Sequence, residues 1–394
     1  MIIFANQNLF DMKKLIIPLL AILSFAAMSC KRSNTDDKDL LEFVRQTVKD
    51  STGTFSLIKG YHDIGSLGTI AIIGEPEKSI LLAERFVSSD KFDNIDGKVA
   101  KDGLPDFSGE SYDVILDAYD DPYEHFIASD TDSLREAILR NVIAAVDTAC
   151  YITPFNKDAK LRKSSSKIFV LSSSLNSLYG QQDVDTLFKM AGKKAKVISP
   201  VFAASEAIGN KEPANVVVWA DNDVAQSFVY QKVLGSRLAK GSKVSVIVPE
   251  PLGDVSSRLR SLLAKYITEG KDPLSVLILD DYGVDIDALY LSVESIRKEL
   301  TEEDYNINKL LSKNFRIIDP IDALTESCYR MMRKENRFTH NIAYPKARFF
   351  QTEESESGDP VLIGLSDRYM SAEIGQFIDV NTVAIKPFYV SEHN

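Results

Sequence analysis

The sequence predicts an α/β protein in which helices cover both faces of parallel sheets. Three observations support this class. Eight short apolar runs recur along the chain, and nearly all are continuous rather than alternating, which is typical of strands buried on both faces. Segments with helical periodicity lie between these runs, as βαβ units with right-handed crossovers require. A length of 394 residues suggests two domains of ordinary size.

The expected strands are the apolar runs themselves, each bounded by turn residues or polar residues. In chain order they are Thr69–Ile73, Tyr112–Leu116, Lys167–Leu171, Ala195–Ile198, Asn215–Trp219, Lys243–Val248, Leu274–Leu279 and Phe315–Ile318.

The expected helices fill the intervals between the strands. Asp130 to Ser133 and Asp183 supply side chains that can cap helix N-termini. Two polar inserts, Ser88–Glu110 and Asn156–Ser166, interrupt the alternation, and Thr352–Asp359 reads as an acidic exposed loop. The helical stretches are Lys78–Val87, Asp132–Cys150, Asp183–Ala191, Asp223–Ala239, Val255–Tyr266, Asp285–Leu300 and Ile321–Lys334.

The N-terminus has the pattern of a secretory signal. Met12-Lys13-Lys14 is positive, Leu15 to Met28 is almost entirely apolar, and small residues lead to Cys30. We therefore expect a lipoprotein-type signal peptide over 1–29, a lipidated Cys30, and a polar tether over 30–60. The chain would then be lipid-anchored on the extracytoplasmic side of the cell membrane or outer membrane. An ordinary signal, with Cys30 incidental, is the alternative.

Charge narrows the choice of partners. The formal net charge is −11, and removal of the first 30 residues, with two lysines and one aspartate, leaves about −12. Nucleic-acid binding needs a basic surface, so no nucleic-acid partner is expected. The membrane is expected as a partner only through lipid on Cys30. The few cysteines and histidines show no metal-ligand spacing, and no metal or cofactor is expected.

Two cysteines, Cys150 and Cys328, remain after Cys30. Both lie in apolar, helix-like stretches, which favours buried thiols. In an oxidising compartment they could also pair, and the sequence leaves this alternative open.

Residues that follow the strands are the candidate ligand-binding residues, because ligands of open parallel sheets bind beyond the carboxyl ends of the strands. The set is acidic and rich in hydroxyls, which suits polyols or cations, and the tyrosines can stack on a ring. The alternative for each residue is a helix cap. The candidates are Glu75, Asp117, Tyr119, Ser172, Asp221, Glu250 and Asp281.

The segment Val216–Asp223, the following helix Val224–Lys240 and the strand Gly241–Ile247 resemble a known crossing point. In order and spacing they are similar to the place where the chain passes to the second lobe in the sugar- and nucleoside-binding branches of the type I periplasmic binding proteins. The resemblance implies two doubly wound parallel-sheet lobes joined by a hinge, with 61–220 plus 338–394 as the N-terminal lobe and 221–337 as the C-terminal lobe.

The resemblance also implies a cleft between the lobes. Asp221 would match the cleft aspartate, with Glu75, Tyr119 and Ser172 on the same lobe and Glu250 and Asp281 facing them. The function expected on this basis is a membrane-anchored receptor for a small polar solute, such as a sugar or nucleoside, with a membrane transport or receptor partner.

Catalysis is the less favoured interpretation, and no catalytic residue is assigned. G-x-S-x-G, Walker-type and G-x-G-x-x-G motifs are absent from the expected positions. Two alternatives stay open: a lipoprotein that uses the fold for protein contacts, and a hydrolase acting through strand-end carboxylates, whose pairing is spatial. The aromatic segment Asn336–Pro345 could line a site or connect a helix to a returning strand.

Overall fold

The computed structural model describes residues 40–365, apart from 50–52, 63, 128, 157, 159, 251, 269–271, 340–342 and 359. The predicted signal peptide and Cys30 lie outside these residues, so export stays a prediction. By compactness the chain divides into Met1–Arg45 and Gln46–Asn394, and the following concerns the second unit. None of the helices in the described part combines the length and the apolar character that a membrane span requires.

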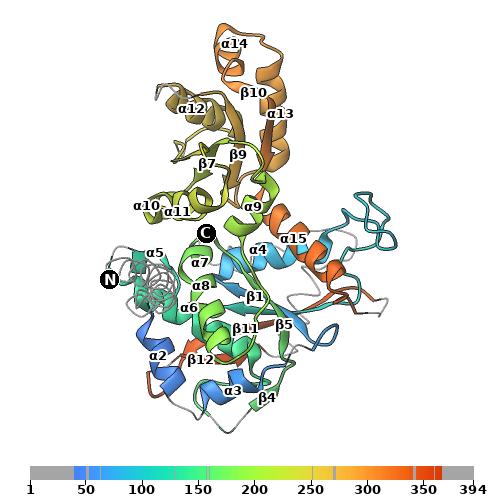
Figure 1. Cartoon of the computed structure of the whole chain (residues 1–394), viewed down its shortest axis with the longest axis vertical. Helices are drawn as coiled ribbons and strands as arrows, with labels where there is room; N and C mark the ends of the chain where they lie inside the picture. Colours follow the sequence, from blue (N-terminus) through green and yellow to red (C-terminus); the bar gives the residue numbers. More distant parts are fainter. Residues whose placement is uncertain are drawn as a thin grey trace, which may run out of the picture. The chain divides into compact units, whose positions relative to one another are not determined.

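An eight-stranded sheet contains strands from both ends of this unit (Figure 1), in the order β4-β3-β12-β11-β2-β1-β5-β6. The central strands run parallel, and β12 and β4 are antiparallel to their hairpin partners β11 and β3. The strands are β1 (Thr69–Gly74), β2 (Ser111–Leu116), β3 (Ala149–Tyr151), β4 (Lys160–Arg162), β5 (Ser166–Leu171), β6 (Val197–Ile198), β11 (Lys346–Glu354) and β12 (Pro360–Gly364).

A four-stranded sheet is formed by the middle of the chain, in the order β10-β9-β7-β8, and all its pairs are parallel. Its strands are β7 (Asn215–Ala220), β8 (Lys243–Ile247), β9 (Leu274–Asp280) and β10 (Leu311–Ile318). Helices connect them, so each step is a βαβ unit. The helices are α10 (Asn222–Ser227), α11 (Val229–Arg237), α12 (Val255–Thr268), α13 (Ile286–Arg297) and α14 (Glu302–Asn308).

The remaining helices belong to the part of the chain that forms the larger sheet. Asp130 caps α6 through its side chain, which accepts a hydrogen bond from the backbone of Ser133. These helices are α2 (Glu42–Lys49), α3 (Thr54–Gly60), α4 (Pro76–Ser88), α5 (Glu124–Ile127), α6 (Thr131–Val146), α7 (Ser174–Tyr179), α8 (Gln181–Met190), α9 (Pro200–Ile208) and α15 (Pro320–Lys334).

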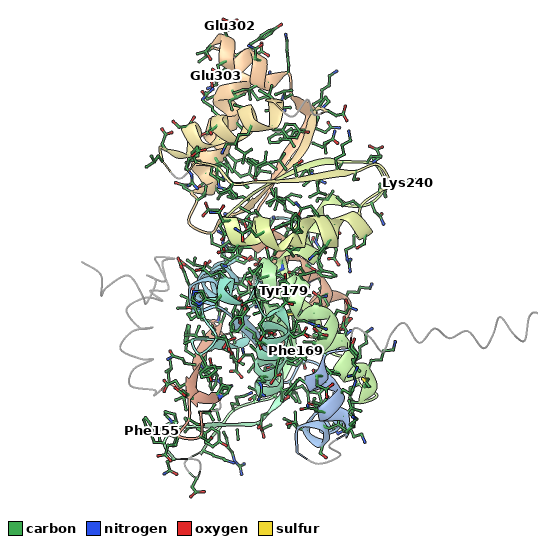
Figure 2. All side chains as sticks on the ribbon, turned by 90° about the vertical axis from the view of Figure 1, so that its left-hand side faces the viewer. Phe155, Phe169, Tyr179, Lys240, Glu302 and Glu303 are labelled. Carbon is green, nitrogen blue, oxygen red and sulfur yellow. The ribbon has the colours of Figure 1, made fainter. Side chains whose placement is uncertain are left out.

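The buried core explains why the strands are continuously apolar. In β7, Val216 and Val218 belong to one hydrophobic cluster, whereas Val217 and Trp219 belong to another on the opposite face. The first cluster also contains Ile72 of β1, so one apolar core joins the two sheets. In Figure 2, Phe169 lies inside this unit, whereas Lys240, Glu302 and Glu303 are among its exposed side chains. The α/β class with parallel strands and two sheet domains is therefore correct.

Several details differ from the sequence predictions. Strand β7 lies in the four-stranded sheet, so the chain passes between sheets before Asn215 and not at the expected boundary after Ala220. The single helix expected from Asp223 to Ala239 is two helices, because Phe228 has a positive φ of 57°. The helix expected to reach Cys150 ends at Val146, and Cys150 lies in β3. Cys150 and Cys328 are both buried free thiols.

Candidate functional site

The strand orders place a topological switch point in each sheet. In the larger sheet the chain leaves β1 toward β2 on one side, whereas β5 leads to β6 on the other. In the smaller sheet β7 leads to β8 on one side and β9 to β10 on the other. Ligands of open α/β sheets bind beyond the carboxyl ends of the strands at such points. The residues that end β1, β5, β7 and β9 are therefore the candidate site.

Glu75 follows β1 and lies at the start of α4, where its carboxylate is bonded to Lys78 Nζ at 2.9 Å. Burial by itself lowers the pKa of Lys78, but the charges of Glu75, Asp221 and Asp280 outweigh it and the net shift is upward. Lys78 is therefore a partly buried ammonium group that acts on carboxylates from both sheets. Glu75 is buried, with 9% of its surface exposed.

The end of β1 is packed tightly against the end of β5. Gly74 has a φ of 144°, and a Cβ there would lie 2.3 Å from Ser172 Oγ and 2.6 Å from Asn176 Nδ2. Only glycine fits this position without movement of its neighbours. Ser172 Oγ accepts a hydrogen bond from Ser79 at 2.9 Å, and Asn176 Nδ2 donates to the carbonyl of Ile73 at 3.3 Å.

Asp280 ends β9 and is 7% exposed. Burial raises its pKa to about 6, although hydrogen bonding by Ser174 and Tyr230 and the charge of Lys78 oppose the shift. Its Oδ2 atom is buried and has no hydrogen-bond partner among the described residues. An ionisable group of this kind can gain and lose a proton near neutral pH.

Two tyrosines from the smaller sheet's part of the chain reach the larger sheet. Tyr282 donates to the carbonyl oxygen of Ser172 at 3.0 Å, and the Tyr230 hydroxyl lies 3.2 Å from Ser174 Oγ. These contacts bring the two switch points together. We call the resulting group of residues the strand-end cluster; it consists of Glu75, Lys78, Ser172, Ser174, Asn176, Asp221, Tyr230, Asp280 and Tyr282.

Asp221 stands at the rim of this cluster. Its side chain is exposed and caps α10, accepting a hydrogen bond from the backbone N–H of Val224 at 2.9 Å. Its charge nevertheless raises the pKa of Asp280 and of Lys78. Asp221 is therefore both a helix cap and part of the electrostatics of the cluster.

Two of the sequence candidates are held by hydrogen bonds of their own. Asp117 is fully buried and accepts from Tyr123 Oη at 2.7 Å and from Thr352 Oγ1 at 2.9 Å. Burial raises the pKa of Asp117 against these bonds. Tyr119 donates through its backbone N–H to Thr352 and through its hydroxyl to the carbonyl of Gly358. These contacts fix β2 to the β11–β12 hairpin.

Glu250 and Asp281 do not face Glu75 across a cleft as expected. Glu250 follows the edge strand β8, is exposed and pairs with Lys265 at 2.8 Å. Asp281 follows Asp280 directly, but its carboxylate is bound by Arg258 at 3.0 Å and by Trp219 Nε1 at 3.2 Å. Adjacent residues at a strand end point to opposite faces, so only Asp280 belongs to the cluster.

Six members of the cluster were not among the sequence candidates: Lys78, Ser174, Asn176, Tyr230, Asp280 and Tyr282. Asp280 and Tyr282 lie on either side of the candidate Asp281, so the correct strand end was identified but not the correct face. Lys78 lies one helical turn after Glu75, a spacing at which oppositely charged residues pair. Tyr230 lies on α11, and its role depends on the packing of two sheets.

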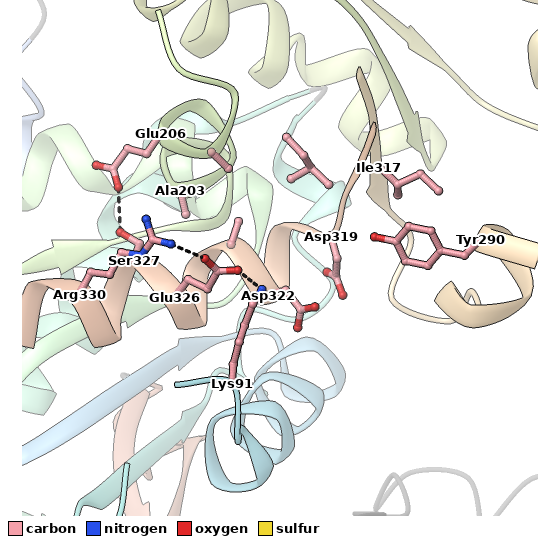
Figure 3. Close-up of a pocket in the computed structure, with 13 residues that line it drawn as sticks. Lys91, Ala203, Glu206, Tyr290, Ile317, Asp319, Asp322, Glu326, Ser327 and Arg330 are labelled. Carbon is pink, nitrogen blue, oxygen red and sulfur yellow. Dashed lines mark hydrogen bonds and ion pairs between the residues drawn. The ribbon is translucent and has the colours of Figure 1, made fainter. Parts of the chain in front are cut away.

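A second feature is a groove beside α15, with a cavity of about 200 Å³ (Figure 3). In Figure 3 the Tyr290 hydroxyl points toward Asp319, and Lys91 and Arg330 both reach Glu326. Burial raises the pKa of Asp319 to about 6, and the charge of Asp322 adds to the shift. The groove is lined by Lys91, Ala203, Glu206, Ala207, Tyr290, Ile317, Ile318, Asp319, Asp322, Ala323, Glu326, Ser327 and Arg330.

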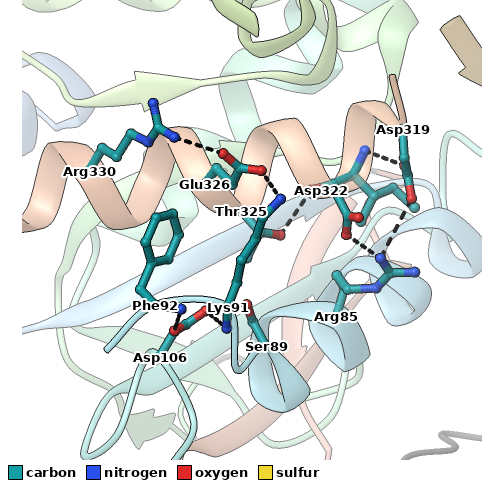
Figure 4. A network of polar contacts seen from close by, with 11 residues as sticks. Arg85, Ser89, Lys91, Phe92, Asp106, Asp319, Asp322, Thr325, Glu326 and Arg330 are labelled. Carbon is teal, nitrogen blue, oxygen red and sulfur yellow. Dashed lines mark hydrogen bonds and ion pairs between the residues drawn. The ribbon is translucent and has the colours of Figure 1, made fainter. Parts of the chain in front are cut away.

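The charged groups of the groove are paired with one another (Figure 4). Arg85 lies 3.5 Å from Asp319 and is also bonded to Asp322, while Lys91 is bonded to Glu326. Arg330 reaches Glu326 at 3.1 Å. Since these ion pairs connect α15 with α4 and the segment after it, we interpret them as contacts that stabilise the packing of these elements and not as a reactive site.

No group of three or more His, Cys, Asp or Glu side chains in the described ranges is arranged to hold a metal ion. The strand-end cluster contains a carboxyl group whose pKa is raised to about 6 and a partly buried ammonium group whose charge acts on it. This arrangement suits proton transfer to or from a small molecule.

No family model and no curated protein matches the sequence. Among solved structures, glutamate racemase RacE1 from Bacillus anthracis is similar over 79% of this chain and 95% of its own, with 15% identity and a TM-score of 0.44. Glutamate racemase from Francisella tularensis subsp. tularensis SCHU S4 is similar over 74% and 90%, with 13% identity and a TM-score of 0.45. PH1733, an aspartate racemase homologue from Pyrococcus horikoshii OT3, is similar over 68% of this chain and 100% of its own, with 12% identity and a TM-score of 0.39.

These findings correct the family assignment, because the similar structures are racemases and not periplasmic binding proteins. The expectations drawn from that resemblance are corrected with it: a solute receptor, a small polar solute and a transport partner. Lipidation of Cys30 was predicted from the N-terminal pattern and stays a prediction. The expectation of a protein without catalytic activity finds no support among these structures, whose names are those of racemases and racemase homologues. Which reaction this chain performs depends on its own residues.

Proposed function

We propose that this protein is an enzyme that transfers a proton to or from a small substrate bound at the strand-end cluster. The observation that carries the proposal is Asp280. It is buried at a switch point, its pKa is raised to about 6, and one carboxyl oxygen has no partner among the described residues. A general acid or base works best when its pKa lies near the operating pH, so Asp280 is the proposed proton-transferring group.

Lys78 is the proposed electrostatic partner of Asp280. It stays charged because Glu75, Asp221 and Asp280 raise its pKa above the ordinary value despite burial. A fixed positive charge in a partly desolvated site stabilises negative charge that develops on a substrate when a proton leaves. Ser174 and Tyr230 lie beside Asp280 and fix the orientation of its carboxyl group.

The names of the similar structures suggest one class of test compound. Their names refer to glutamate and aspartate, and racemisation of an amino acid exchanges the hydrogen on its α-carbon. Amino acids are therefore one class in the assay, beside amines, hydroxy acids and sugars.

Proton transfer can be tested without knowledge of the product. The full chain is incubated with each compound in D₂O, and mass spectrometry detects deuterium that has become bound to carbon. We expect uptake into at least one class with the native protein, little uptake with Asp280→Asn, and full uptake with Glu250→Gln. The last variant removes a strand-end carboxylate that lies outside the cluster. If no compound gains deuterium, or if Asp280→Asn matches the native rate, the proposal is wrong.

A further inference from the structure

The strand-end cluster contains two buried hydrogen-bond acceptors that lack donors within the described part of the chain. They are Asp280 Oδ2 and Asn176 Oδ1, on residues that are 7% and 0% exposed. A buried acceptor without a donor costs free energy, and more so when it is charged. Both residues belong to the cluster: Asn176 lies on α7 and contacts the end of β1, and Asp280 lies at the end of β9. The cluster is therefore suited to a ligand that donates N–H or O–H groups.

The charges in the cluster specify the kind of donor. Glu75, Asp221 and Asp280 are carboxylates, and Lys78 is the positive group that they share. Its ammonium is already bonded to Glu75 at 2.9 Å, which leaves Asp221 and Asp280 without a direct cationic partner among the described residues. The pKa of Asp280 is raised further by the charge of Asp221. A second positive charge would relieve this repulsion, and a negative charge would increase it.

Acidic groups behind Glu75 strengthen this preference. Burial raises the pKa of Asp121 to about 6, and the charges of Glu75 and Asp117 add to the shift. Asp223 of α10, on which the charge of Lys78 also acts, lies against Glu124 of α5, and burial followed by this contact raises the pKa of Asp223. Carboxylates therefore surround the cluster from elements belonging to both sheets.

We infer that the substrate of the strand-end cluster is a cation, with a primary ammonium or guanidinium group that enters between Asp221 and Asp280 and donates N–H bonds to the unpaired acceptors. An acidic substrate is excluded by the same charges. This inference rests on the proposed function for the word substrate, but the binding preference that it states is independent of turnover.

The test is calorimetric binding to the full chain at neutral pH and low salt, with L-lysine, L-norleucine and L-glutamate as probes. Lysine and norleucine have the same chain length and differ in one ammonium group. We expect lysine to bind at least about tenfold more tightly than norleucine, as one charge-assisted hydrogen bond would provide. We expect glutamate to bind more weakly than norleucine. Agmatine serves as a second cationic probe with a guanidinium group.

Two variants connect this preference to the cluster. Asp280→Asn should weaken the binding of lysine at least about tenfold and leave the affinity for norleucine almost unchanged. Asp221→Asn should reduce the preference to a smaller extent, because asparagine keeps the helix cap and loses only the charge. Glu250→Gln is the matched control and should bind all probes as the native chain does.

Each outcome decides between the two proposals. Equal or tighter binding of norleucine or glutamate overturns the cation inference, and so does the absence of binding by both lysine and agmatine at millimolar concentration. Lysine binding that is unchanged in both aspartate variants overturns it as well. If cations bind as expected but no compound exchanges hydrogen in D₂O, the proposed reaction fails and the binding inference stands. If deuterium enters only acidic substrates, the proposed reaction stands and the cation inference fails.

Discussion

The strand-end cluster and the groove beside α15 are both rich in carboxylates, but they differ in how these carboxylates are paired. In the groove, Arg85 forms ion pairs with Asp319 and Asp322, and Lys91 and Arg330 form ion pairs with Glu326. In the cluster, Asp280 is buried with an unpaired oxygen, and Lys78 is shared among three acids. Paired charges fasten one element to another. A buried carboxyl oxygen without a partner costs stability, and carboxyl groups with perturbed pKa values cluster at functional sites.

The largest expected effect is the loss of activity in Asp280→Asn. The substitution keeps the shape of the side chain but removes the ability to accept a proton. Removal of a general acid or base typically slows the reaction by about 100-fold or more. The rate of deuterium uptake measures this effect directly. A loss of less than about threefold would place Asp280 in a structural role, since general acid–base groups contribute far more than that.

The same substitution that lowers activity should raise the free energy of unfolding, and the size of this increase should depend on pH. The pKa of Asp280 is about 6 in the folded chain against 3.8 as the ordinary value. The folded state therefore binds the proton more tightly than the unfolded state. The stability conferred by this protonation is present below pH 4 and is lost as pH rises from about 4 to about 6. The loss amounts to about 3 kcal/mol.

Urea unfolding of the native chain and of Asp280→Asn measures this difference. The two proteins should have similar free energies of unfolding near pH 4, and the variant should be more stable by up to about 3 kcal/mol at pH 7. A variant that is less stable than the native chain at pH 7 would contradict the unpaired state of Asp280. Asp319, whose pKa is also about 6, contributes to both proteins and cancels in the comparison.

In the groove, removal of a cation should destabilise the fold and spare the reaction. Arg85→Met leaves Asp319, whose side chain is 11% exposed, and Asp322 without that guanidinium. We expect the free energy of unfolding to fall by about 1–3 kcal/mol, the cost of leaving a mostly buried group unpaired. Lys243→Met breaks an exposed pair with Asp272 and is the control that should unfold like the native chain. Equal stability of both variants would show that the groove does not fasten α15.

The smallest expected effect concerns Glu250, the strand-end acid that lies outside the cluster. Glu250→Gln removes an exposed pair with Lys265 at the edge strand β8. Its unfolding midpoint and its deuterium uptake should both equal those of the native chain within error. A clear loss of uptake would extend the site to the end of β8, and the contrast between Glu250 and Asp280 would fail.

Local sequence patterns located most of the secondary structure. The run predicted from Thr69 to Ile73 is β1, and that from Leu274 to Leu279 is β9; each strand extends one residue further than predicted. These strands could be predicted because a strand buried on both faces leaves a continuous apolar run. The short strands β3 and β4 could not, since β4 is fully exposed and has three residues.

The site could be predicted in part, through the rule that ligands bind at the carboxyl ends of parallel strands. Glu75, Ser172 and Asp221 were chosen by this rule and lie in the strand-end cluster. Glu250 was chosen by the same rule and lies at an edge, because sequence does not show that β8 is the outer strand. Asp281 was chosen instead of Asp280 because the sequence does not show which of two adjacent acids faces the other sheet.

The sequence by itself determined the α/β class, the strands with their polar ends and the excess of acidic charge, because these depend on local pattern and composition. Only the tertiary structure decided the strand order, and therefore which strand ends meet at a switch point. It also decided that Asp280 is buried beside Tyr230 and Ser174, whereas Asp281 is bound by Arg258. The physical reason is that burial and charge pairing depend on neighbours that are distant in the chain, and these set the pKa of a carboxyl group.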